Sequence, residues 1–272
     1  MVLLLLVDLD QDLAALGPLG GFFVLRTGGA PHAPLPTLAA AYTAYTDSAY
    51  TTHAHTTYAP YADENQFSDA FRNPITFRVK KVAHSLRAPE MRVAASVAQQ
   101  GLAARLWSVT LACAVLYGGI PDLDPGLVHW DPDAGAPDDL WLSEIRPLPA
   151  DSATVADVVL EGHLEPLAAA LRARHRIAPG LLRGNAASAL AGAARQLDQW
   201  ARAHGHPRAA AHTRSLTVEL LAHPLLSGTG TLTGTSFRRR SCCLYYRVPG
   251  GGLCGDCCFT RPPRSSAHDT SG

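Results

Sequence analysis

The chain has 272 residues with a formal net charge of zero, and 47% of its residues are hydrophobic. A chain of this length can bury one sizeable core, with room for a small appended module. Because its charge is balanced, the composition gives no electrostatic basis for nucleic acid or an anionic membrane surface as the main partner.

Two apolar stretches are both too short to cross a membrane. Val2 to Val7 has no basic residue before it and is followed by Asp8, so it fits neither a span of about 20 residues nor a signal peptide. The stretch from Trp107 to Ile120 ends at a glycine pair and is interpreted as a core helix. We therefore predict a protein without a transmembrane segment, located in the cytoplasm or peripherally at the inner face of the membrane.

The first third of the chain is predicted to contain the strands. A short helix is expected to lead through Gly17 to Gly21 into a strand around Phe22 to Leu25. Thr, Phe and Val residues favour a second strand at Ile75 to Val82. Residues 28–66 are rich in Ala, Thr, Pro and Tyr without a clean period, which is typical of a loop or a loosely packed insertion.

The rest of the body is predicted to be helical. A long helix is expected after Pro89 and ends at Gly118, because its apolar residues recur at intervals of four and three. Another begins near Asp151, a good N-cap residue, and Pro166 should kink or divide it. Two further helices are expected, from about Leu181 to His204 and from Pro207 to the residue before Pro224.

The cysteines are distributed very unevenly. Only Cys113 stands apart, inside the long helix, where we interpret it as a small buried hydrophobe. In a chain for which no export signal is predicted, the clustering of the rest indicates metal or redox chemistry rather than a disulfide framework. The clustered cysteines are Cys242, Cys243, Cys254, Cys257 and Cys258.

The spacing of these cysteines is that of a metal-binding motif. Cys242 and Cys243 are followed, after ten residues, by Cys254-x-x-Cys257. Four thiolates suffice for a tetrahedral metal ion or for a [2Fe–2S] cluster, so the spacing leaves zinc open as an alternative. Glycines at 250–252 let the chain fold back, so that both pairs can face one centre.

A buried cluster of this kind carries negative charge, and reduction adds more, so nearby cations are needed. Positive charge would also favour the reduced state. The candidates are Arg238, Arg239, Arg240 and Arg247, of which at least one or two are expected to be solvated.

The motif Cys-Cys-x10-Cys-x2-Cys, complete at the four positions just given, resembles the signature of the FhuF family of ferric-siderophore reductases. Segments 96–107 and 182–192 are also similar to that family, so the resemblance covers roughly residues 90–260. Two features depart from it. Cys258 lies beyond the pattern, as a spare thiol or an alternative ligand, and we predict that it is dispensable; the Tyr/Thr/His-rich insertion at 40–60 has no counterpart.

The resemblance implies a cytoplasmic one-electron reductase that frees iron from imported ferric siderophores of the hydroxamate type. Its [2Fe–2S] cluster would be held by Cys242, Cys243, Cys254 and Cys257. No nucleotide-binding motif follows a strand, so electrons are expected from a separate donor such as a ferredoxin or a flavin reductase. The alternatives are a protein with structural zinc on the same cysteines, or a ferredoxin-like electron carrier without a chelate site.

Four polar residues lie inside otherwise apolar helices, and we interpret them as bridges between helices. The alternative is that they line the chelate pocket or hydrogen-bond near the cluster. They are Gln99, Gln100, Arg105 and Asn185.

The predicted fold class is α+β, predominantly α-helical, with a few strands in the N-terminal third and a small C-terminal cysteine-rich segment. The predicted divisions are 1–88, an N-terminal α/β region with a low-complexity loop at 28–66; 89–234, a helical body; 235–260, the cluster-binding segment; and 261–272, a disordered tail.

Overall fold

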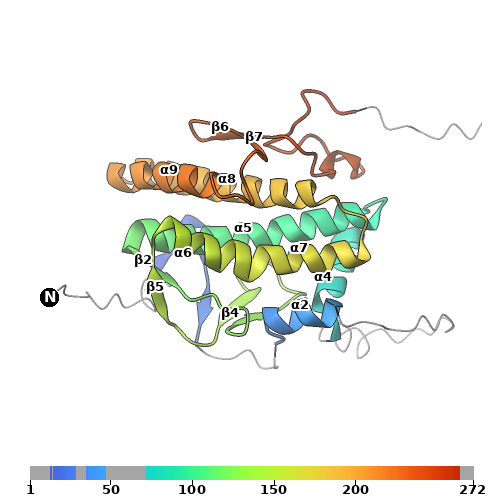
Figure 1. Cartoon of the computed structure of the whole chain (residues 1–272), viewed down its shortest axis with the longest axis horizontal. Coiled ribbons are helices and arrows are strands. Elements are labelled where there is room, and N and C mark those ends of the chain that lie inside the picture. The colour runs from blue at the N-terminus through green and yellow to red at the C-terminus, as the bar shows by residue number, and fades with distance from the viewer. Residues whose placement is uncertain (1–12, 14, 29–34, 47–71, 264–272) are drawn as a thin grey trace, which may run out of the picture.

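The computed structural model describes residues 13, 15–28, 35–46 and 72–263. Helices form the body, the strands that precede residue 150 lie at one side of it, and a strand hairpin with the cysteine-rich end of the chain covers the opposite side (Figure 1). This confirms the predicted class, a mostly helical fold with few strands. Within the described residues, no helix has the length and apolar character that a membrane span requires.

The central helix of the body is α5 (Met91–Tyr117). It packs against α4 (Pro74–Leu86) and against α8 (Pro179–Ala203), and buried side chains therefore occur on every side of it. Gly118 ends it in the left-handed conformation, with a φ of 72°, as the sequence predicts. Cys113 is fully buried within it, in agreement with its interpretation as a core residue.

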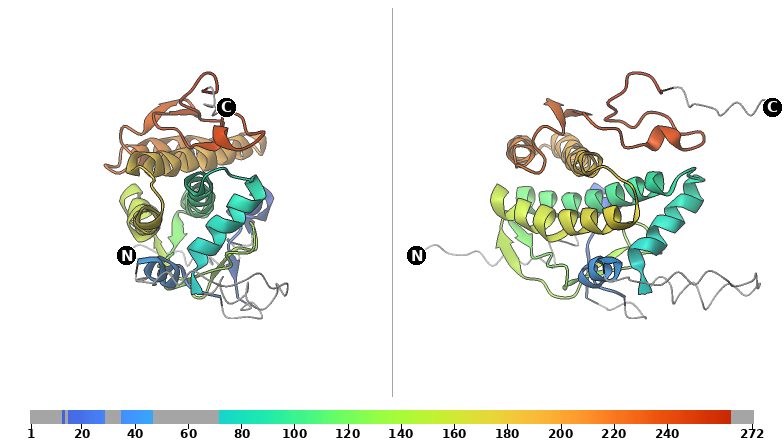
Figure 2. Two further views of the ribbon diagram at one scale, coloured as in Figure 1. Left: turned by 90° about the vertical axis from the view of Figure 1, so that its right-hand side faces the viewer. Right: turned by 45° about the vertical axis from the view of Figure 1, so that its right-hand side comes forward.

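A second helical layer lies between α5 and the cysteines (Figure 2). It consists of α8 and α9 (Pro207–Leu221), which pack against each other. Both helices begin and end within about two residues of the predicted bounds. Proline in the first turn of each fixes the start, and Gly205, with a φ of 75°, lies between them.

The helix expected from Asp151 is a run of three elements. The carboxylate of Asp151 accepts hydrogen bonds from the amides of Ala153 and Thr154, at 3.1 and 3.0 Å, and so caps the run. Pro166 lies in the first turn of the last element, so the predicted division is confirmed. The elements are α6 (Ser152–Ala156), the π-helical η3 (Asp157–Leu164) and α7 (Glu165–Arg174).

The predicted strand at Ile75 to Val82 is wrong, because this segment forms α4. The side chain of Asn73 accepts a 3.3 Å hydrogen bond from the Thr76 amide, and Pro74 occupies the first turn. These two start signals outweigh the strand propensity of the β-branched residues.

The prediction of a loop over 28–66 is wrong for the helix α2 (Leu38–Thr46); residues 29–34 and 47–66 lie outside the described part of the chain. The hydroxyl of Tyr42 is buried and lies 3.0 Å from His163 Nδ1. Nε2 of the same ring is 2.5 Å from the carbonyl of Leu123. Since a carbonyl only accepts, Nε2 carries the proton and Nδ1 accepts from Tyr42. One buried aromatic residue therefore anchors a helix in a low-complexity sequence.

Most strands lie further along the chain than the predicted N-terminal third. The predicted strand at Phe22 to Leu25 is wrong, because its first residues belong to the 3-10 turn η2 (Gly21–Phe23), and a two-residue strand follows. The strands are β1 (Arg26–Thr27), β2 (Gly119–Pro121), β3 (Val128–Trp130), β4 (Leu140–Leu142), β5 (Pro147–Pro149), β6 (Gly230–Thr233) and β7 (Ser236–Arg239). They pair as β1-β4-β3, β2-β5 and β6-β7. The β6-β7 hairpin crosses the predicted boundary at 234/235, and the division into domains remains a prediction.

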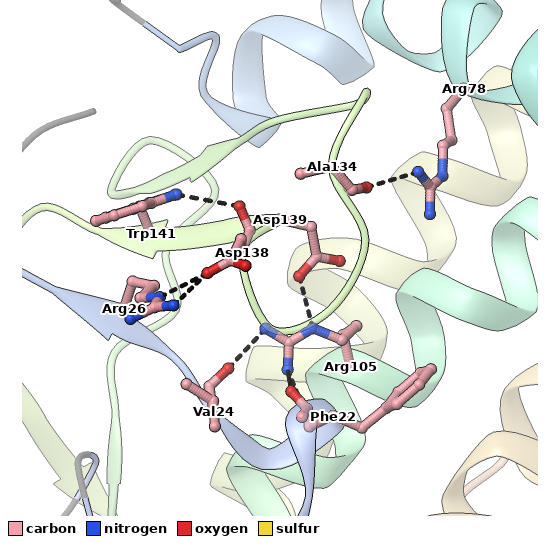
Figure 3. Close-up of polar contacts among 10 residues, drawn as sticks. Phe22, Val24, Arg26, Arg78, Arg105, Ala134, Asp138, Asp139 and Trp141 are labelled. Carbon is pink, nitrogen blue, oxygen red and sulfur yellow. Dashed lines mark hydrogen bonds and ion pairs between the residues drawn. The ribbon is translucent and has the colours of Figure 1, made fainter. Parts of the chain in front are cut away.

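Arg105 connects α5 to the N-terminal segment (Figure 3). Its buried guanidinium donates to Asp139 Oδ1 at 2.8 Å and to the carbonyl of Val24 at 2.6 Å. It also donates to the carbonyls of Gly21 and Phe22. This confirms its interpretation as an internal bridge, and it fixes the backbone of η2 against the central helix.

Candidate functional site

The cysteine segment (residues 235–260) lies along the outer side of α8, where β7 packs against that helix (Figures 1 and 2). Gly184 permits this close approach. A Cβ atom at Gly184 would lie 2.3 Å from Ser241 Oγ and 3.1 Å from Arg239 Nη2. The glycine therefore lets the cysteine segment pack directly on the helix.

The first cysteine pair is fixed to both central helices. Ser96 Oγ in α5 donates a 2.8 Å hydrogen bond to the carbonyl of Cys243. Asn185 in α8 donates to the carbonyl and the hydroxyl of Ser96, at 2.9 and 3.0 Å. Ser241, next to the pair, donates to the carbonyl of Gly180 at 2.9 Å. These bonds position Cys243 relative to α5 and α8.

The turn between Cys254 and Cys257 is fixed through Asp256, which is 6% exposed. Its carboxylate accepts a 2.6 Å hydrogen bond from Ser188 Oγ and two of 3.3 Å from Arg195. Its carbonyl accepts from the amide of Arg239 at 3.0 Å. The second cysteine pair therefore rests on α8 and on β7.

The pKa values of four thiols in the cysteine segment depend on one another. The thiols of Cys242 and Cys254 both donate to the sulfur of Cys243, and this lowers the pKa of Cys243 well below its usual range. The same contacts with Cys243, followed by burial, raise the pKa of Cys242 and of Cys254. Burial raises the pKa of Cys258 as well. Among the predicted ligands Cys242, Cys243 and Cys254, these interactions favour the thiolate form at Cys243.

Cys257, the fourth predicted ligand, interacts electrostatically with Cys254 and Cys258. Backbone amides also point at the sulfurs, since Leu244 N lies 3.2 Å from Cys242 Sγ and Phe259 N lies 3.4 Å from Cys257 Sγ. Amide donors are therefore available to thiolates at Cys242 and Cys257. Among the residues that the structure describes, no group of three or more His, Cys, Asp or Glu side chains is arranged to hold a metal ion.

Arg239 is buried, unlike its neighbours Arg238 and Arg240. Its side chain is 2% exposed, and Nε and Nη1 have no hydrogen-bond partner, while Nη2 donates to the carbonyl of Leu181 at 3.2 Å. Its charge contributes to the lowered pKa of Cys243, after the two thiol hydrogen bonds. Arg238 and Arg240 are exposed. A buried guanidinium with unsatisfied donors beside several thiols is suited to a negatively charged thiolate-ligated group.

The remaining predicted arginine, Arg247, forms an ion pair with Glu90 at the N-terminus of α5.

Gln99 donates a 3.3 Å hydrogen bond to the carbonyl of Leu182, so Gln99 bridges α5 and α8 as Asn185 does. Gln100 differs, because it lines a cleft beside Cys254. His204 and His206 stack on Trp200.

The sequence reasoning missed three residues that position the site: Asp256, Ser188 and Arg195. The sequence did contain a signal for Asp256. An aspartate inside the Cys-Gly-Asp-Cys turn places a charge where the chain must pack closely, so it needs a polar partner. Ser188 and Arg195 are spaced by seven residues, which puts them on the same helical face, but the sequence does not show what that face contacts.

Comparison with known proteins identifies the cysteine segment. Residues 239–259 match the family model of the FhuF 2Fe-2S C-terminal domain. The match contains Arg239 and all five clustered cysteines, and it identifies this part of the chain as a [2Fe–2S] domain of the FhuF type. Among curated proteins, no relative matches the chain.

Proposed function

We propose that this protein reduces ferric siderophores, transferring one electron to chelated Fe(III) so that the iron is released. The observation that carries the proposal is the FhuF-type [2Fe–2S] domain at 239–259, seated on a helical body that fixes both cysteine pairs. Hydroxamate oxygens are hard ligands that hold Fe(III) far better than Fe(II). One added electron therefore weakens the chelate, and no acid–base residue is required.

The cluster ligands in this proposal are Cys242, Cys243, Cys254 and Cys257. When bound, a [2Fe–2S] cluster supplies one-electron transfer. The hydrogen bonds of Ser96 and Asp256 hold the backbone that carries the thiolates. Backbone amides and the guanidinium of Arg239 would stabilise the negative charge of the bound cluster. Electrons come from a separate donor such as a ferredoxin or a flavin reductase, and the protein acts in the cytoplasm.

The first experiment measures the metal content of protein purified anaerobically. Iron and inorganic sulfide in equal amounts, about two of each per chain, and a paramagnetic signal after reduction are expected. One zinc without sulfide would overturn the proposal in favour of a structural zinc protein. Cys254→Ser should lose the visible absorption, whereas Cys113→Ala, in the core of α5, should retain it.

The second experiment mixes reduced protein with the ferric complex of a linear trihydroxamate. Reoxidation of the protein, with Fe(II) appearing in a colorimetric trap, is the expected result. A protein that carries the cluster but fails to reoxidise would instead be an electron carrier.

A further inference from the structure

A cleft opens between the cysteine segment and the helical body. Its volume is about 350 Å³, within the range of about 300–1,000 Å³ that is usual for small-molecule sites. Three parts of the fold form its walls: the segment around η2, the facing sides of α5 and α8, and the turn that begins at Cys254. Among the residues that line it are Phe22, Gln100, Ser108, Gly192, Arg195 and Cys254.

We propose that this cleft is the binding site for the ferric chelate; the inference rests on the proposed reductase function. Cys254 is both a proposed cluster ligand and a residue of the cleft wall. A chelate bound in the cleft therefore contacts Cys254, a proposed ligand of the cluster that transfers the electron. Since electron transfer weakens steeply with distance, this contact is the arrangement that the reaction needs. A protein partner requires about 800 Å² of surface, so a concave site of this size suits a small molecule.

The charges in the cleft favour an uncharged ligand. Arg195 lies 3.3 Å from Asp256, so the cation and the anion of the wall offset each other. The other polar groups are the neutral Gln100, Gln196, Ser108 and Ser188. An Fe(III) trishydroxamate is neutral, whereas a tris-catecholate complex is strongly anionic and would be repelled by the thiolate-bound cluster.

Phe22 supplies an apolar wall that is already in place. Its side chain is 43% exposed, and its carbonyl is fixed by the buried guanidinium of Arg105. Figure 3 shows the ring directed away from that guanidinium. A ring held in this way can pack against the methylene linkers of a hydroxamate siderophore without first being ordered.

The test fills the cleft from Gly192. A Cβ atom there would meet only Arg195 Nη2, at 4.0 Å, so Gly192→Leu places a side chain in the cleft without a backbone clash. The change also removes a glycine from a helix interior, which favours folding. The matched control is Gly162→Leu in η3, a helical glycine outside the cleft whose Cβ would meet the Asp157 carbonyl at an ordinary 3.6 Å.

The measurement is the Kd of the gallium(III) complex of a linear trihydroxamate, which has the shape of the ferric complex but accepts no electron. We expect Gly192→Leu to weaken binding by at least about tenfold and Gln100→Ala to weaken it several-fold, with Gly162→Leu within about twofold of the parent. The visible spectrum should be the same in all four proteins.

Two results would overturn the inference: parent-like binding by Gly192→Leu, or no binding by the parent protein. Neither result decides whether the protein is a reductase, because metal content and reoxidation by the ferric complex are measured separately. Conversely, a zinc-containing protein would end the reductase proposal whatever the gallium titration shows.

Discussion

Ser188 Oγ donates a 2.6 Å hydrogen bond to Asp256 Oδ2, joining the middle of α8 to the turn between Cys254 and Cys257. The acceptor is a buried carboxylate, and its other partner, Arg195, lies at the longer distance of 3.3 Å. The serine is therefore the closest support of the second cysteine pair on the helix.

Ser188→Ala should loosen this turn. A hydrogen bond to a charged group contributes about 1.5–3 kcal/mol, and its loss leaves Asp256 under-solvated. We expect faster bleaching of the visible absorption in the presence of an iron chelator. Ser215→Ala, which removes a 3.2 Å serine–glutamate bond on the exposed face of α9, is the matched control and should bleach at the parent rate. Equal rates in the two variants would contradict the assigned support.

Arg239→Gln should lower the reduction potential of the bound cluster. Reduction adds a negative charge, and the buried guanidinium stabilises that charge. Its removal should shift the midpoint by on the order of 50 mV to more negative values, which corresponds to about a tenfold change in the redox equilibrium. Potentiometric titration measures the shift. Arg240→Gln, at an exposed neighbour, should change little, and Arg239→Lys should restore part of the potential; an unchanged midpoint in Arg239→Gln would exclude the role.

Cys258→Ser should retain the visible spectrum and the iron content. Cys258 lies one position beyond the four-cysteine motif, so its thiol is not needed to complete the ligand set. The comparison is Cys257→Ser, which should lose the absorption. The opposite pattern, loss with Cys258→Ser and retention with Cys257→Ser, would make Cys258 the fourth ligand.

The buried His163 should make the fold less stable in acid. Burial lowers its pKa from 6.5 to about 4, so the folded state binds a proton less readily than the unfolded state does. Its stabilising contribution is therefore full above pH 6.5 and is lost as the pH falls towards 4, by on the order of 2 kcal/mol at pH 5. Urea unfolding at pH 7 and pH 5 measures the loss.

His163→Gln removes the titrating group, so its free energy of unfolding should change less between pH 7 and pH 5 than that of the parent. His204→Gln, at an exposed position, is the control and should keep the parent's dependence on pH. An equal change in His163→Gln and in the parent would show that other groups carry the acid sensitivity.

The cysteine motif and the main helices were predictable because their signals are local. The spacing of Cys242, Cys243, Cys254 and Cys257 is contained in 16 residues, and Gly118 and Pro207 mark helix ends by their own backbone preferences. The four candidate arginines look alike in the sequence. Only tertiary packing, which buries one of them and leaves two exposed, separates their roles.

The errors arose where tertiary packing outweighs local preference. Val79 and Val82 suit a strand, yet the Asn73 cap and the burial of Ile75 and Val79 in the core select a helix. The helix around Tyr42 depends on a partner, His163, that is 121 residues away. No periodicity in the local sequence could have revealed that contact.

The anchors of the cysteine segment also bear on how the protein is made. Ser96 and Ser188 precede the groups that they hold, Cys243 and Asp256, by 147 and 68 residues. During translation α5 and α8 therefore leave the ribosome before the cysteines do. The two helices can pack together before the cysteine segment binds to them. The helical body can therefore fold before the cluster is inserted.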